Sequence, residues 1–238
     1  MIHKAVPISE PFDLTNLVTV GSGQIVSFPI CEQKAFSFIL FALDREESIT
    51  TEYSLVDKWL FVMEGQLEVC IGQDCYFVNN KESIVVPPNA AYELRAVTPV
   101  KLLQANVANT KQDIKPIRED KKMTKPLINK IPHAEPLRLA DQIEIMPNQT
   151  SSKSIVQRSD LSMTLFALDK DSVIAKHSTP GDAMVQVLEG IVEITIGDEL
   201  YTVSSGESIV MPANIPHALK AIEGFKMLLT VVKHPPQG

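Results

Sequence analysis

The sequence predicts an all-β protein made of two copies of one small β-barrel domain. Two observations lead to this prediction. The chain repeats itself at a fixed offset, and each copy is composed of short apolar or alternating runs separated by turn residues. Many short strands with regularly spaced turns are typical of β-sandwiches and barrels.

The repeat is visible without any gap. The tetrapeptide FALD occurs at residues 41–44 and again at 166–169, an offset of 125. Over the 72 positions that begin at Phe36 and at Leu161, this offset gives 27 identities. A match of this quality indicates that the chain arose by internal duplication.

The offset also predicts the domain boundaries. Each copy has at most 113 residues, so we expect an N-terminal domain at 1–113 and a C-terminal domain at 126–238. The segment between them, 114–125, is rich in Lys and Arg and contains a proline. Such composition is typical of an exposed linker.

Within the C-terminal copy, the strand signal is alternation of apolar and polar residues. Residues 191–196 alternate, and residues 162–168 and 184–188 are short apolar or alternating runs. A short helix is expected where the chain enters each domain, near residues 12–18 and 137–143.

Composition excludes several classes of protein. Hydrophobic residues make up 45% of the chain and charged residues 21%, which is sufficient for a sizeable core. The net charge of −7 argues against a nucleic-acid-binding protein. There is no apolar run long enough to span a bilayer and no apolar signal-peptide core at the N-terminus. We therefore expect a cytoplasmic protein without nucleic-acid or membrane partners.

The three cysteines all lie in the first half of the chain. Cys70 and Cys75 flank a predicted turn, so a disulfide or redox pair across a hairpin is one interpretation. The favoured interpretation is that Cys31, Cys70 and Cys75 are small buried hydrophobic residues with free thiols, as in a reducing compartment.

Gly206, Pro212 and His217 stand at fixed spacing in the C-terminal copy, with Asn214 in the turn between the last two. This pattern resembles the second motif of the cupin family, in which a glycine usually occupies the turn. Asn is a common replacement because it tolerates the left-handed conformation. The resemblance implies two tandem cupin domains, each a jelly-roll β-barrel of the RmlC-like type (a bicupin).

The first cupin motif contains two histidines separated by one residue, then a glutamate and a glycine. His177 and Gly190 match it, whereas Thr179 replaces the second histidine and Ala183 replaces the glutamate. The resemblance implies that His177 and His217 point into the barrel and bind a divalent metal, Fe, Mn, Ni or Zn, in the C-terminal domain only. The alternative is that both are hydrogen-bonded histidines retained from a metal-binding ancestor.

The N-terminal copy has lost every motif histidine. Glu52 stands in place of His177, Ser54 in place of Thr179, Lys58 in place of Ala183 and Tyr92 in place of His217. Without imidazoles or thiolates, a metal is not expected there. Glu52 and Tyr92 are instead candidates for a polar pocket.

Three functions stay open from the sequence. The first is binding of a small molecule in the C-terminal barrel, with or without a metal. Besides the two histidines, its expected ligand-binding residues are Thr179, Val185, Val187 and Met211. The second is a metal-dependent cupin enzyme of the dioxygenase, decarboxylase or isomerase type, with no catalytic residue assigned. The third is a structural bicupin without catalysis, and pairing of two chains into a homodimer is left open.

Overall fold

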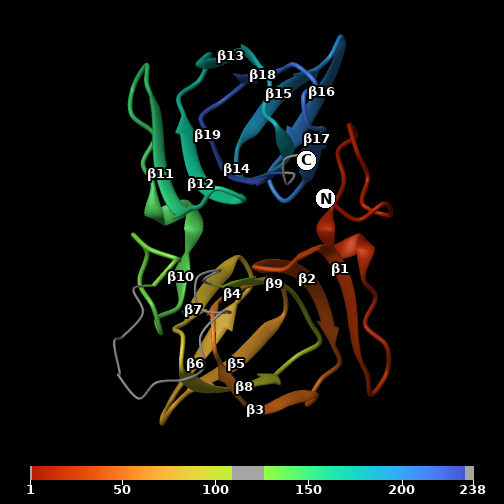
Figure 1. The fold of residues 1–238 in the computed structure, drawn as a ribbon, viewed down its shortest axis with the longest axis vertical. Coiled ribbons are helices and arrows are strands. Elements are labelled where there is room, and N and C mark those ends of the chain that lie inside the picture. The colour runs from red at the N-terminus through yellow and green to blue at the C-terminus, as the bar shows by residue number, and fades with distance from the viewer. Residues whose placement is uncertain (1, 109–125, 234–238) are drawn as a thin grey trace. The chain divides into compact units, whose positions relative to one another are not determined.

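The computed structural model describes residues 2–108 and 126–233 (Figure 1). Regular structure in these residues is almost entirely β-strand, which confirms the all-β prediction. Two short 3-10 helices, η1 (Leu14–Leu17) and η2 (Leu139–Gln142), lie where the sequence predicts short helices. The predicted linker at 114–125 lies outside the described residues. No helix in the described part of the chain has the length and apolar character required to cross a membrane.

The described chain forms two compact units, each built around one β-barrel. One unit runs from Val18 to Leu137, and the other combines the chain up to Leu17 with the chain from Arg138 onward. The N-terminal barrel therefore includes the first residues of the second copy, 126–137. The C-terminal barrel includes the N-terminal segment of the whole chain.

Two sheets make up the N-terminal barrel. Its strands are β1 (Ile25–Gln33), β2 (Phe36–Leu43), β3 (Ser48–Ser54), β4 (Asp57–Glu64), β5 (Gln66–Ile71), β6 (Asp74–Asn79), β7 (Glu82–Val86), β8 (Ala90–Ala96) and β9 (Val100–Val107). One sheet has the order β1-β2-β9-β4-β7-β10, where β10 is Leu137–Arg138. The other has the order β3-β8-β5-β6.

The C-terminal barrel repeats this arrangement. Its strands are β11 (Thr150–Gln157), β12 (Leu161–Leu168), β13 (Val173–His177), β14 (Gly181–Glu189), β15 (Ile191–Ile196), β16 (Glu199–Ser204), β17 (Ser208–Met211), β18 (His217–Ala221) and β19 (Phe225–Lys233). The sheets have the orders β11-β12-β19-β14-β17 and β13-β18-β15-β16 (Figure 1). The equivalent strands pair in the same order in both barrels, as an internal duplication requires.

Strand β15 shows how alternation builds the barrel interior. Val192, Ile194 and Ile196 are buried, whereas Glu193 and Thr195 between them are partly exposed. Side chains two apart on a strand share a face, so the three apolar residues enter the core of the C-terminal barrel together. The predicted strand at this position is confirmed.

An arm from the other copy completes one edge of each barrel. Ser9 N donates to Val210 O at 3.0 Å, and Phe12 exchanges two backbone hydrogen bonds with Ser208 on β17. At the positions 125 residues later and earlier, Ala134 N donates to Val85 O at 2.8 Å. The arms thus cover the edge strands β17 and β7, which would otherwise expose unpaired backbone groups.

The cysteines differ from the favoured interpretation. Cys70 and Cys75 lie opposite each other on β5 and β6 and form a disulfide. Cys75 is exposed and Cys70 is partly exposed, so neither is a buried hydrophobic residue, because their side chains lie on the outer face of the sheet. Cys31 is buried as expected.

Candidate functional site

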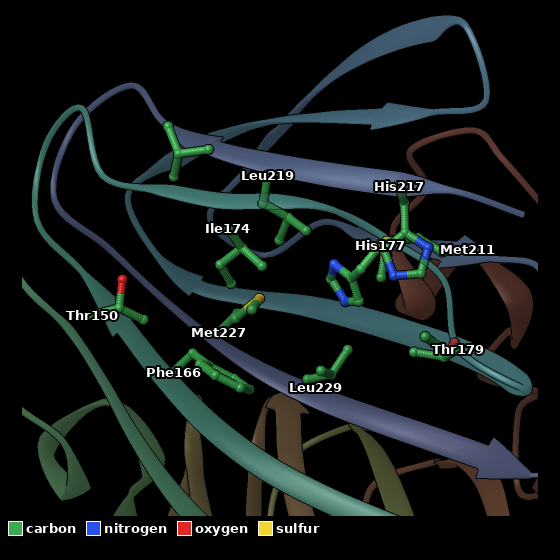
Figure 2. A pocket seen from close by; sticks show the side chains of 12 residues that line it. Thr150, Phe166, Ile174, His177, Thr179, Met211, His217, Leu219, Met227 and Leu229 are labelled. Carbon is green, nitrogen blue, oxygen red and sulfur yellow. The ribbon is translucent and has the colours of Figure 1, made fainter.

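A cavity of about 350 Å³ lies inside the C-terminal barrel (Figure 2). Its wall is mostly apolar and comes from both sheets. The lining residues are Thr150, Phe166, Val173, Ile174, His177, Thr179, Ala183, Met211, His217, Leu219, Met227 and Leu229. Among the residues predicted from the sequence, His177, His217, Thr179 and Met211 line this cavity together.

The strand register places the two histidines side by side. His177 on β13 is the direct partner of His217 on β18. A register shift between Ile174 and His177 precedes this pair. The two imidazole centroids are 4.5 Å apart, and their planes meet at 66°. Figure 2 shows both rings at the same end of the cavity as Met211 and Thr179.

The backbone determines which nitrogen of each imidazole carries the proton. His177 Nδ1 lies 2.9 Å from the carbonyl oxygen of Ala175, and His217 Nδ1 lies 3.0 Å from that of Ile215. A carbonyl oxygen only accepts, so Nδ1 is the donor in both rings. In the neutral imidazole, Nε2 then carries a lone pair that can accept a hydrogen bond or bind a metal.

Burial differs between the two histidines. His217 is 1% exposed, whereas His177 is exposed. Burial lowers the pKa of His217 below its ordinary value, and the charge of a protonated His177 lowers it further. The hydrogen bond to Ile215 opposes this shift without cancelling it. The neutral form of His217 is therefore favoured in the folded protein.

Thr179 stabilises the turn that leads into β14. Its Oγ1 donates to Gly181 O at 2.8 Å, and its carbonyl accepts from Asn214 N at 2.7 Å. Asn214 has a φ of 63°, the left-handed conformation expected of the residue that replaces the motif glycine. The Thr179 hydroxyl thus donates its proton within the turn, so toward a ligand it can act only as a hydrogen-bond acceptor.

The remaining predicted wall residues lie elsewhere in the barrel. Val185 and Val187 belong to the buried core of the C-terminal barrel and are not among the cavity-lining residues. The alternation along β14 does bring them to the inner face with Ala183. Phe166 on β12 and Met227 on β19 contribute parts of the wall that the sequence pattern did not predict. Strand alternation predicts that these residues face inward, but it does not distinguish inward residues that line a cavity from those that pack in the core.

The site differs from the motif of the family at the positions needed for a full metal centre. Within residues 2–108 and 126–233, there is no group of three or more His, Cys, Asp or Glu side chains placed to hold a metal ion. Ala183 lines the cavity with a methyl group, which cannot bind a metal, and the Thr179 hydroxyl donates a hydrogen bond to the backbone carbonyl of Gly181. The donors present fit two-imidazole binding and do not fit a three- or four-ligand centre.

The N-terminal barrel holds a hydrogen-bonded polar network at the equivalent positions. Tyr92 on β8 is the direct partner of Glu52 on β3, and its hydroxyl donates to the Glu52 carboxylate. Lys58 Nζ donates to Tyr92 Oη at 2.5 Å and to Gln104 Oε1 at 3.4 Å. Lys58 stands where Ala183 lines the cavity of the other barrel, so its side chain extends into the corresponding space.

The pKa values of Lys58 and Tyr92 in this network are shifted by burial and by the Glu52 carboxylate. Burial lowers the pKa of Lys58, and the nearby Glu52 carboxylate opposes that shift. Burial and the hydrogen bond to Glu52 both raise the pKa of Tyr92, which keeps the phenol protonated. The expected polar arrangement of Glu52 and Tyr92 is therefore present, with Lys58 and Gln104 as additional members.

Comparisons with known proteins agree with this architecture. Residues 164–233 match the model of the cupin domain family. A cupin 2 conserved barrel domain protein from Leptotrichia buccalis is 27% identical, with a TM-score of 0.80 over 96% of this chain and 99% of that chain. No curated protein gives a significant match.

Two more distant structures share the fold alone. A putative glyoxylate-induced protein from Pseudomonas aeruginosa is 19% identical, with a TM-score of 0.59 over 90% of this chain and 83% of that chain. A salicylate 1,2-dioxygenase variant from Pseudoaminobacter salicylatoxidans is 12% identical, with a TM-score of 0.59 over 83% and 70%. Residues 164–233 thus form a cupin domain, and the chain as a whole has the fold of cupin-barrel proteins.

Proposed function

We propose that the protein binds a small organic molecule in the cavity of its C-terminal barrel. The observation that carries this proposal is the cavity itself, about 350 Å³ in volume, apolar over most of its wall and with His177 and His217 at one end. Apolar cavities of this size with a few converging polar groups are the usual form of small-molecule sites. His177, His217 and Thr179 are the proposed orienting residues, and Met211 is a wall residue.

The N-terminal barrel supports a division of roles between the two copies. The Lys58 side chain, with its hydrogen bonds to Tyr92 and Gln104, extends into the space that corresponds to the region beside Ala183. We assign this barrel a structural role, with no ligand or metal. The reaction of the dioxygenase that shares the fold is not transferred to this chain, because 12% identity shows the fold alone.

A thermal-shift screen of small organic molecules tests the proposal. Ligands that bind the native state raise the unfolding temperature, and the rise grows with the ratio of ligand concentration to Kd. Leu229→Trp fills the cavity, and Leu200→Trp adds the same side chain at an exposed position on β16. We expect stabilising compounds for the wild type and Leu200→Trp and none for Leu229→Trp. Compounds that stabilise all three proteins equally would refute the cavity as the site.

A second candidate is metal-assisted binding or catalysis at the same site. It is favoured by the hydrogen bonds of the two Nδ1 atoms to Ala175 and Ile215, which leave both Nε2 lone pairs available. His177 and His217 would hold the ion with water or substrate in the other positions, and a bound divalent ion would supply Lewis-acid chemistry. A cupin enzyme of the dioxygenase, decarboxylase or isomerase type requires a bound metal ion at this site.

Metal content separates the two candidates. The purified, untagged protein is incubated with Fe, Mn, Ni or Zn, desalted and measured by plasma mass spectrometry beside His177→Ala. Near one ion per chain in the wild type and loss in the variant would support the metal-assisted version. The same low content in both proteins would exclude a resident ion at this pair and leave metal-free binding as the function.

A further inference from the structure

The cavity wall formed by the described residues carries no permanent charge. None of its twelve lining residues is Asp, Glu, Lys or Arg, and the ionisable groups among them are the two imidazoles. A carboxylate or phosphate that enters an apolar cavity loses its hydration, and that loss is large unless an opposite charge compensates for it. A ligand with a fixed negative charge therefore finds no fixed partner here.

The two imidazoles favour a donor as the polar group of the ligand. Each Nδ1 proton is already donated to a backbone carbonyl, from His177 to Ala175 and from His217 to Ile215. In the neutral rings, the remaining nitrogens are acceptors. The Thr179 hydroxyl also has its proton engaged, by Gly181 O. The polar end of the cavity therefore presents acceptors, which suit an O–H or N–H group and repel an anion.

The rest of the cavity suits a compact apolar body. Figure 2 shows Phe166, Met227 and Leu229 between the histidine end and Thr150 at the opposite end. Aromatic and thioether side chains make favourable contacts with an aromatic ring. Apart from the Thr150 hydroxyl at the far end, hydrogen-bond acceptors are thus concentrated at the histidine end, and the wall between the two ends is apolar.

We propose that the ligand is an uncharged molecule of the phenol class, with its hydroxyl donating to one ring nitrogen of the imidazole pair and its ring against Phe166 and Met227. This inference rests on the proposed function and adds the chemical class that the cavity selects. If this proposal is right, the protein binds a phenol more tightly than the matching carboxylate and the matching ether.

Isothermal titration with three matched probes tests the class. The probes are para-butylphenol, para-butylbenzoate and para-butylanisole, which share one apolar body and carry a donor, an anion and an acceptor respectively. The titrations contain a chelator and are run near pH 8, above the ordinary pKa of histidine. We expect one phenol per chain, with the other two probes at least about tenfold weaker, the effect of one lost buried hydrogen bond.

Two single-residue variants test whether the histidines cause the preference for the phenol. His217→Phe retains a ring of similar size without an acceptor, and Tyr92→Phe is the equivalent change in the N-terminal barrel. We expect His217→Phe to weaken phenol binding toward the affinity of the anisole, because one of the two acceptors is lost, and Tyr92→Phe to leave phenol binding unchanged. His177→Phe replaces His217→Phe as the test if the buried substitution prevents folding.

The outcomes separate the chemical class from the proposed function. Equal affinity for the three probes, or a preference for the benzoate, with binding lost in Leu229→Trp, would overturn the phenol class and retain the cavity as a binding site. A phenol preference that survives in both histidine variants would also overturn it. Absence of binding for every probe would overturn the class and count against the proposed function.

Discussion

His177 and His217 face each other across β13 and β18 with their ring centroids 4.5 Å apart. The same cross-strand position in the N-terminal barrel holds Glu52 and Tyr92. One duplicated geometry thus carries two chemistries, an imidazole pair beside a cavity and a carboxylate–phenol pair bonded to Lys58. The difference between Ala183 and Lys58 is central, because a methyl group leaves the space that a lysine side chain occupies.

Stability is expected to depend on pH through His217. Its folded pKa lies below the unfolded value of about 6.5, so the unfolded state binds the proton more readily. The contribution of this group is complete above pH 6.5 and declines as the pH falls toward the folded pKa, by at most about 1.4 kcal/mol per unit. Urea unfolding between about pH 7.5 and pH 5.5 measures the slope. An unchanged slope in His217→Asn would contradict this assignment.

Lys58 is expected to support the N-terminal barrel through its volume and its hydrogen bonds. Lys58→Ala removes the donor to Tyr92 and Gln104 and opens a void, so we expect the free energy of unfolding to fall by about 1–3 kcal/mol. Lys58→Met retains most of the side-chain volume and is expected to cost less. Fluorescence of Trp59, the single tryptophan, follows urea unfolding of this barrel. An alanine variant as stable as the wild type would refute the role.

Gly190 is expected to be far less tolerant than Gly197. Both have positive φ, 81° and 63°, but an added Cβ at Gly190 would lie 2.4 Å from Gly224 O, whereas nothing lies within 4 Å of one at Gly197. Alanine at Gly197 carries only the cost of the left-handed conformation, about 1–2 kcal/mol. We expect Gly190→Ala to exceed that cost by at least about 1 kcal/mol. Circular dichroism during urea unfolding provides the comparison, and equal costs would show that the close approach is unimportant.

The disulfide predicts a specific thiol count. The denatured protein should contain one reactive thiol without reductant, that of Cys31, and three after reduction. Alkylation followed by mass spectrometry should find Cys70 and Cys75 in one cross-linked peptide. Three reactive thiols in protein purified without reductant would show that the pair is reduced in solution.

Much of this organisation can be predicted from the sequence because duplication and spacing are local signals. The offset of 125 predicts two equivalent barrels, and the motif spacing predicts that Asn214 occupies a left-handed turn. The alternation along each strand predicts which side chains face inward. Together these signals are sufficient to bring His177 and His217 into one barrel.

The remaining features depend on packing and pairing across long separations. Val185 and Phe166 both face inward, but only the fit of all side chains determines that Phe166 borders a void and Val185 does not. Gln104 joins Lys58 from a strand 46 residues away. The sequence also does not predict which arm pairs with which barrel. Both copies carry similar arms and similar edge strands, so by sequence alone Ser9 could pair with Val85 or with Val210.

Methionine-methyl NMR tests the central claim, that the ligand enters the C-terminal barrel, most directly. The chain has eight methionines, of which Met211 and Met227 line the cavity and Met63 lies on β4 of the other barrel. Signals are assigned with Met211→Leu and Met227→Leu, and para-butylphenol is added to the labelled wild type. We expect the Met211 and Met227 methyl signals to shift while the Met63 signal stays in place. A shift of Met63 alone, or no shift of the two cavity methionines at saturation, would contradict the account.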